Sequence, residues 1–184
     1  MDREMTPRKP RLATVWLGGC SGCHMSFLDL DERLLDLAGM VELCASPITD
    51  YKTFPEADIT LVEGAVANVE HLEHLKEVRR RTKILVSFGD CAVTGNVTAL
   101  RNPFGLEDVL NRAYRETSAT IIGVPGGKGG SVVPRLLERV VPLHEVVPVD
   151  YFLIGCPPSA DAIFELVTAL LENRAPALQG RKFG

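Results

Sequence analysis

The sequence lacks several features that would assign the chain to a broad functional class. No apolar run approaches the roughly 18 residues that a membrane-spanning helix needs. There is no basic stripe either, and 24 acidic residues outnumber 20 lysines and arginines, which gives a net charge of −4. This balance argues against nucleic acid as the main partner. We therefore expect neither a membrane span nor a nucleic-acid partner.

The chain also lacks a recognisable export signal at its start. Residues 1–10 are polar and contain no apolar segment of the kind that secretory signals carry. This pattern predicts a cytoplasmic protein. In that reducing compartment structural disulfides are rare, so clustered thiols are more often metal ligands or redox-active groups.

The chain has 184 residues, of which 46% are hydrophobic and 24% charged, as is typical of one globular domain. We divide it into a polar extension (1–10), a single domain (11–174) and a tail (175–184). Short apolar runs predict strands, and longer amphipathic segments predict helices. The predicted strands cover 12–17, 41–45, 59–62, 84–88 and 151–154, and the predicted helices cover 26–39, 68–81, 92–100, 106–117, 134–141 and 160–171.

This alternation of strands and helices predicts an α/β fold with a mostly parallel sheet and helices on both faces. The predicted helix from residue 68 has Asn68 as its cap, with acidic residues early and arginines late, which suits the helix dipole. The glycine-rich stretch 123–130 is expected to be a mobile loop. Its lysine is not followed by Ser or Thr, so it fails the phosphate-binding pattern, and we expect a subunit contact instead.

Four of the five cysteines follow predicted strands and sit beside glycines: Cys20, Cys23, Cys91 and Cys156. The carboxyl ends of parallel strands meet at one edge of the sheet, where ligands gather. These four side chains are therefore expected to lie together. Cys44 lies inside a predicted strand without a glycine turn, and we interpret it as a core residue.

The four cysteines allow three interpretations. Unligated buried thiols are one, although glycine-flanked turns are poor places for core packing. A structural zinc ion is another, although zinc sites usually take two local cysteine pairs. An iron–sulfur cluster is the interpretation we favour, because one local pair is joined here by two distant single cysteines.

Taken in order, the motifs resemble the small subunit of nickel–iron hydrogenases. They are Cys-x-x-Cys at Cys20 and Cys23, Glu63-Gly64, Gly89-Asp90-Cys91 and Gly155-Cys156-Pro157-Pro158. The resemblance spans residues 12 to 172. It implies a flavodoxin-like fold with one [4Fe-4S] cluster at the carboxyl edge of the strands, held by Cys20, Cys23, Cys91 and Cys156. It also implies a nickel–iron centre in a separate large subunit, because nothing in this chain supplies nickel ligands.

Two details indicate which type of small subunit the chain resembles most. Ser21 and Gly22 separate the first two cysteines, whereas the related small subunit of respiratory NADH:quinone oxidoreductase typically has an adjacent pair. Further cysteine and histidine ligands for medial and distal clusters, and a twin-arginine signal, are missing. The chain thus resembles the soluble bidirectional NAD-reducing type, in which electrons leave for a diaphorase module with its own flavin and iron–sulfur clusters. A bound flavin (FMN) is compatible with this group, but no residue demonstrates one. The alternatives are an electron-transfer subunit of a coenzyme-reducing hydrogenase or of a quinone-linked oxidoreductase, and a zinc-stabilised interaction module.

Several other residues are candidates near this site. Glu63 is interpreted either as a proton relay or as a cap of a loop or helix. His24 is interpreted either as a group that orients the loop or bonds a cluster sulfur, or as a surface residue. The helical pair His71 and His74 is assigned to a solvated face. Pro157-Pro158 stiffens the last turn. Five glycines allow close approach of the backbone to the cluster: Gly18, Gly19, Gly22, Gly89 and Gly155.

Overall fold

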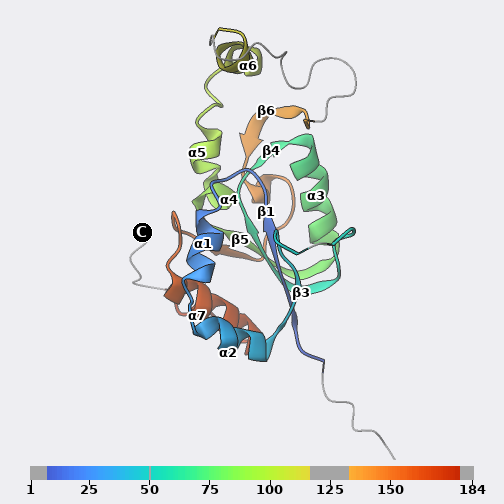
Figure 1. The fold of residues 1–184 in the computed structure, drawn as a ribbon, viewed down its shortest axis with the longest axis vertical. Helices are drawn as coiled ribbons and strands as arrows, with labels where there is room; N and C mark the ends of the chain where they lie inside the picture. Colours follow the sequence, from blue (N-terminus) through green and yellow to red (C-terminus); the bar gives the residue numbers. More distant parts are fainter. Residues whose placement is uncertain (1–7, 50, 117–132, 179–184) are drawn as a thin grey trace, which may run out of the picture.

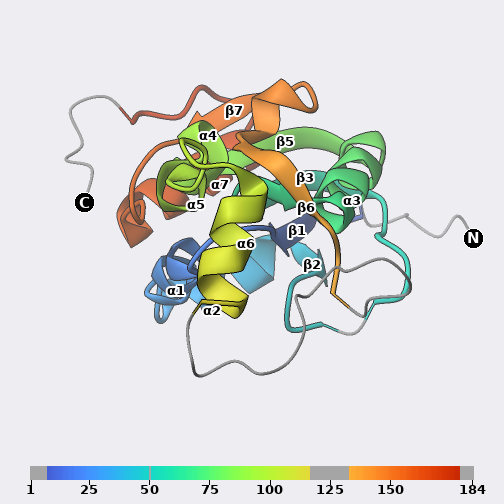
Figure 2. The ribbon, with the colours of Figure 1, turned by 90° about the horizontal axis from the view of Figure 1, so that it is seen from above.

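A computed structural model of the chain describes residues 8–49, 51–116 and 133–178. Its centre is a five-stranded parallel sheet with the order β2-β1-β3-β5-β7 (Figures 1 and 2). The strands are β1 (Arg11–Trp16), β2 (Glu42–Ala45), β3 (Ala57–Glu63), β5 (Thr82–Phe88) and β7 (Tyr151–Leu153). Counted within the sheet, this order is 2-1-3-4-5, which is the flavodoxin-like arrangement. The predicted fold class is confirmed.

Helices cover both faces of the sheet, as predicted (Figures 1 and 2). On one face α1 (Gly22–Leu28), α2 (Arg33–Met40) and α7 (Ala160–Leu171) pack against Leu61 and Val86 in one apolar cluster. On the other face α3 (Val69–Arg80) packs through Leu75 and Val78 in a second cluster. Because both faces are covered, the central strand β3 is buried along nearly its whole length, which explains the apolar residues Ile59, Leu61 and Val62 on both of its faces.

Several predicted elements match the structure closely. The closing helix α7 has the predicted bounds. Asn68 caps α3 as predicted, and its Oδ1 accepts a hydrogen bond from the backbone N–H of His71 at 2.8 Å. The described residues contain no helix that is both long and apolar enough to cross a membrane. The predicted loop at 123–130 lies outside the described residues.

Three predicted helices differ from the structure. The segment 26–39 forms two helices, α1 and α2, because the chain turns between them, where Asp31 has a left-handed φ of 51°. Gly39 lies within α2 rather than ending it. The segment 92–100 is likewise divided into α4 (Asp90–Thr94) and α5 (Asn96–Ala99) at Gly95. The helix predicted at 106–117 is α6 (Leu106–Tyr114), which ends earlier.

The helix predicted at 134–141 is wrong. This segment forms a strand, β6 (Leu136–Val141), which pairs antiparallel with β4 (Val66–Asn68), a strand that the sequence did not predict. A 3₁₀ turn at Leu143–Glu145 follows. The partner strand lies far away in the sequence, and strand formation depends on such partners more than on local pattern.

Candidate functional site

Four strands of the sheet end level with one another. Trp16 is in register with Glu63, Glu63 with Phe88, and Phe88 with Leu153. The turns that carry cysteines leave the sheet directly after three of these residues, so they start from one edge. The structure thereby brings together segments that are far apart in the sequence.

The four cysteines beyond these strand ends line a single cavity of ≈ 80 Å³. Cys23 and Cys91 are buried, whereas Cys20 and Cys156 are exposed. All five cysteines of the chain are free thiols. The lining residues are Cys20, Gly22, Cys23, Glu63, Asp90, Cys91, Gly155, Cys156 and Pro157. The juxtaposition that the sequence predicted is therefore present, with two ligand candidates inside the fold and two at its rim.

The first cysteine turn is held by Glu63, which is only 3% exposed at the end of β3. Its carboxylate accepts hydrogen bonds from the backbone N–H of Cys23 at 3.3 Å and of His24 at 3.0 Å. These N–H groups lie at the start of α1 and lack partners within the helix. Glu63 therefore caps α1, the second of the two roles considered for it. The proton-relay role remains a prediction.

His24 does not line the cavity, but its side chain is largely buried beside Glu63, so the surface interpretation is wrong. Its side chain is 11% exposed, and its Nδ1 contacts the Glu63 carboxylate. The ring also meets Trp16 edge-on, with centroids 5.2 Å apart. These contacts make His24 part of the support of the first turn. Its Nε2 is buried and has no hydrogen-bond partner among the described residues.

The second and third cysteine turns are tied directly to each other. The backbone N–H of Asp90 donates to the carbonyl oxygen of Gly155 at 2.9 Å, and the N–H of Gly155 donates to Asp90 Oδ1 at 2.8 Å. The hydroxyl of Ser26, on α1, donates to the carbonyl oxygen of Pro158 at 2.5 Å. All three turns are thus cross-linked by short hydrogen bonds. Sequence reasoning missed Asp90, although it stands between a glycine and a cysteine.

Gly89 and Gly155 are the two glycines on which the site's backbone depends most. Gly89 has φ 83° and ψ 163°, a region open to glycine alone. A Cβ at Gly89 would overlap the sulfur of Cys23. A Cβ at Gly155, where φ is 144°, would lie 2.5 Å from Cα of Pro158. Gly19 and Gly22 are less restricted, since the nearest atoms to a Cβ there would lie at 3.3 Å and 3.2 Å.

The surroundings of the cavity raise the pKa of both buried thiols. Burial raises the pKa of the Cys23 thiol, and the Glu63 carboxylate and the other three cysteines raise it further. Burial and then the neighbouring Cys20 raise the pKa of Cys91, although hydrogen bonding to Thr98 and Val97 opposes this. Thiolates are the form that binds metal, and a bound metal deprotonates a coordinating thiol. The four sulfurs, in a cavity supported by hydrogen bonds, fit an iron–sulfur cluster.

A single metal ion fits this cavity less well. A tetrahedral zinc site has Zn–S distances of about 2.3 Å, so its sulfurs lie about 3.8 Å apart. No group of three or more His, Cys, Asp or Glu side chains in the described part of the chain is arranged to hold one metal ion. The four cysteines line one cavity but form no such single-ion group among the described residues. A multinuclear cluster, whose irons each take one cysteine, suits the four cysteines better, and the zinc interpretation is not favoured.

The remaining sequence candidates lie away from the cavity. Cys44 is half-buried on β2, and its thiol donates to the carbonyl oxygen of Leu12 at 3.3 Å. The solvated-face assignment of His71 and His74 is wrong, because both are half-buried. The ring of His74 packs edge-on against Phe54, and burial lowers the pKa of both histidines. The pattern of flanking charges did not reveal this packing.

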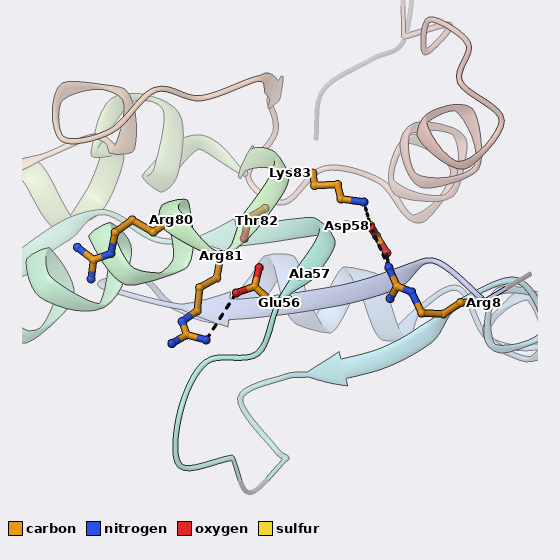
Figure 3. A pocket seen from close by; sticks show the side chains of 8 residues that line it. All are labelled: Arg8, Glu56, Ala57, Asp58, Arg80, Arg81, Thr82 and Lys83. Atoms are coloured by element: carbon orange, nitrogen blue, oxygen red, sulfur yellow. Dashed lines mark hydrogen bonds and ion pairs between the residues drawn. The ribbon is translucent and has the colours of Figure 1, made fainter.

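A second cavity lies at the opposite edge of the sheet, before β3 and β5, and has a volume of ≈ 150 Å³ (Figure 3). Its charged side chains are largely paired with one another. Arg8 and Lys83 both contact the Asp58 carboxylate, and Arg81 lies 3.7 Å from Glu56. No cysteine lines this cavity. Asp58, which lines it, joins the starts of β1, β3 and β5 through its bonds to Arg11 and Lys83.

Comparison with known proteins places the chain in a class. Residues 20–170 match the family described as the 20 Kd subunit of NADH ubiquinone oxidoreductase, and the chain belongs to this family. Within it, the chain is 47% identical to the delta subunit of the NAD-reducing hydrogenase HoxS of Cupriavidus necator, over 90% of this chain and 80% of the relative. It is 40% identical to a subunit of the F420-non-reducing hydrogenase of Methanothermobacter marburgensis, over 90% of this chain and 54% of that relative.

Solved structures agree with this placement. A chain of an NAD+-reducing [NiFe]-hydrogenase in the H2-reduced state superposes with a TM-score of 0.87 and 44% identity, over 96% of this chain and 100% of that chain. A [NiFeSe] hydrogenase from Desulfovibrio vulgaris Hildenborough superposes with a TM-score of 0.57 at 17% identity, over 91% of this chain and 61% of that one, and shares the fold. The resemblance to nickel–iron hydrogenase small subunits, with the NAD-reducing type as the nearer one, is confirmed.

Proposed function

We propose that the chain is the electron-transfer small subunit of a cytoplasmic NAD-reducing [NiFe] hydrogenase, with one [4Fe-4S] cluster held by Cys20, Cys23, Cys91 and Cys156. The observation that carries the proposal is that these cysteines line one cavity at the carboxyl edge of the sheet. The similarity to the HoxS delta subunit supports the choice of the NAD-reducing type. When bound, such a cluster accepts and passes on one electron at a time.

In this role the chain's own residues do not react with hydrogen. The buried Cys23 and Cys91 anchor the cluster within the fold, and the exposed Cys20 and Cys156 hold it at the surface, where a partner approaches. Glu63 and Asp90 keep the three ligand turns in place through their hydrogen bonds. Residues 11–174 act as one cluster-binding domain, between an extension (1–10) and a tail (175–184).

The proposal requires partners. A large subunit supplies the nickel–iron centre, and diaphorase subunits with flavin and iron–sulfur clusters take the electrons to NAD. A flavin on this chain remains a prediction, which flavin analysis of the purified complex tests. Similarity to the F420-non-reducing hydrogenases favours one alternative, a chain that serves another electron acceptor. Reduction of NAD by H2 in the purified complex decides between the two.

The cluster itself is tested by replacing one proposed ligand and one matched cysteine. Cys156→Ser is expected to lose most cluster iron and H2-driven NAD reduction, because serine is a poor ligand for iron in this role. Cys44→Ser is expected to retain both, since the Cys44 thiol contacts a carbonyl oxygen on β1. Iron and acid-labile sulfide are measured in anaerobically purified protein. Equal loss of iron in both variants contradicts the ligand assignment, and a colourless wild-type protein with bound zinc contradicts the proposal as a whole.

A further inference from the structure

The side chain of Asn96 lies beside one of the four cysteine sulfurs. Its amide Nδ2 donates a hydrogen bond to Sγ of Cys156, with an N···S distance of 3.5 Å. Sulfur is a weak acceptor as a thiol, but it becomes a stronger one when it carries negative charge. The bond connects residues that are 60 positions apart in the sequence.

The backbone around Asn96 is shaped to present this side chain. Gly95, which lies between α4 and α5, has φ 85°, and Asn96, the first residue of α5, has φ 34°. Asparagine tolerates positive φ better than most residues that have a side chain. The turn thus combines an unusual backbone conformation with an amide group that reaches Cys156.

A closed ring of hydrogen bonds fixes the position of Asn96 relative to Cys156. The backbone N–H of Asn96 donates to Thr94 Oγ1 at 3.3 Å, and this hydroxyl donates to the carbonyl oxygen of Asp90 at 2.9 Å. Asp90 in turn exchanges two hydrogen bonds with Gly155, the residue before Cys156. Both ends of the Asn96–Cys156 bond are therefore anchored to Asp90. Such support is what holds a group in place around a metal ligand.

We propose that Asn96 is a positioning residue that raises the reduction potential of the cluster through its hydrogen bond to the Cys156 sulfur. When the cluster takes up an electron, its sulfur ligands become more negative, and an amide donor stabilises that charge. The electron comes from the large subunit and leaves for the acceptor module, and no covalent bond forms or breaks. The inference rests on the proposed function, because it requires the cluster.

The test measures the potential of the cluster in the purified complex, by anaerobic redox titration followed by electron paramagnetic resonance. Asn96→Gly keeps the positive φ and removes the donor. We expect the ratio of reduced to oxidised cluster at a fixed potential to fall about threefold, which is about 28 mV at 59 mV per tenfold for one electron. Asn96→Asp adds a negative charge beside the sulfur and is expected to lower the potential further.

The matched control is Asn173→Gly. Asn173 also has a positive φ, of 56°, and lines a cavity with Arg8 and Pro10 at the other edge of the sheet. Its replacement is expected to leave the potential unchanged. An unchanged potential in either Asn96 variant with intact cluster iron overturns the inference. Loss of the iron in both variants also overturns it, because Asn96 would then be needed to bind the cluster and not to set its potential. Absence of an iron–sulfur cluster from the wild-type protein overturns the proposed function instead.

Discussion

Gly89 occupies a position where any side chain would meet the sulfur of Cys23. Its φ of 83° and ψ of 163° add a backbone strain of about 1–3 kcal/mol for other residues. Gly89→Ala is therefore expected to lower the free energy of unfolding by at least about 1–3 kcal/mol and to reduce the iron content. Urea unfolding and iron analysis of the anaerobically purified protein measure the two effects.

Gly39 provides the control for this substitution. It lies in α2, and a Cβ there would have no neighbouring atom within 4 Å. Gly39→Ala is expected to raise stability by about 0.5–1 kcal/mol, because alanine restricts the unfolded chain more than glycine does. The iron content should not change. If both variants have the same stability and iron content, the site does not require glycine at position 89.

Glu63 binds three groups of the first cysteine turn with one carboxylate. Glu63→Gln keeps one oxygen acceptor but turns an amide N–H₂ toward a backbone N–H or toward His24. Leaving a buried donor without a partner costs about 1–3 kcal/mol, and we expect a loss of stability in that range. Glu138→Gln, at an exposed residue of β6, serves as the control and should change stability by less than about 0.5 kcal/mol. Equal urea midpoints for the two variants would show that Glu63 does not act as a cap.

At the scale of elements, Asp58 joins the starts of neighbouring strands. Its carboxylate accepts hydrogen bonds from the backbone N–H of Arg11 on β1 at 2.7 Å and from Arg8, and it pairs with Lys83 on β5 at 2.8 Å. Burial raises the pKa of Asp58, but the hydrogen bonds from Lys83 and Arg11 and the nearby positive charges outweigh it, so the pKa is lowered. The unfolded chain consequently binds a proton at Asp58 more readily than the folded chain does.

The sign of the pH dependence follows from this difference. The stabilisation by Asp58 is present above its unfolded pKa of about 3.9 and is lost as the pH falls through the lower folded value. Asp58→Asn cannot titrate, so the gap in urea midpoint between wild type and variant should shrink between about pH 5 and pH 3. Glu138→Gln, which removes an exposed carboxylate of β6, serves as the control and should leave the slope unchanged. If the urea midpoints of wild type and Asp58→Asn change in parallel with pH, the lowered pKa of Asp58 is contradicted.

Some strands and helices can be predicted from the local sequence and others cannot, and the difference has physical causes. Central strands such as β5 contain runs of apolar residues, here Ile84-Leu85-Val86, because helices cover both faces of the sheet, and such runs can be recognised in the local sequence. β6 was mistaken for a helix because its strand character comes from pairing with β4. The break between α1 and α2 depends on a left-handed φ at Asp31, a residue whose type only weakly favours that conformation.

At the scale of the whole molecule, the four cysteines could be predicted to meet, because each follows a strand of the same parallel sheet. The hydrogen bonds that hold the cysteine turns in place could not be predicted. The bonds of Asp90 to Gly155 and of Asn96 to Cys156 connect different turns, and they depend on how those turns align once the strands are in register. Glu63 was recognised as a candidate, but its bonds to Cys23 and His24 required the geometry of α1 against β3.

The cluster is expected to stabilise the ligand turns more than the sheet. The core around Leu61, Val86 and Leu85 is fully buried, and of the four site cysteines only Cys23 belongs to it. Metal binding contributes free energy to the folded state, and here it cross-links turns that leave three different strands. Removal of iron should therefore lower the urea midpoint, but leave a folded sheet.

Hydrogen–deuterium exchange of the chain with and without iron can localise this effect. Amides of residues 18–24, of Gly155 and of Cys156 are expected to exchange faster after iron removal, because their turns lose the cross-link, whereas amides of β3 and β5 stay protected. Cys44→Ser, which retains iron, should match wild type throughout. Uniform loss of protection across the sheet would instead mean that the cluster holds the whole fold together, because the two apolar clusters would then be unable to stabilise the sheet alone.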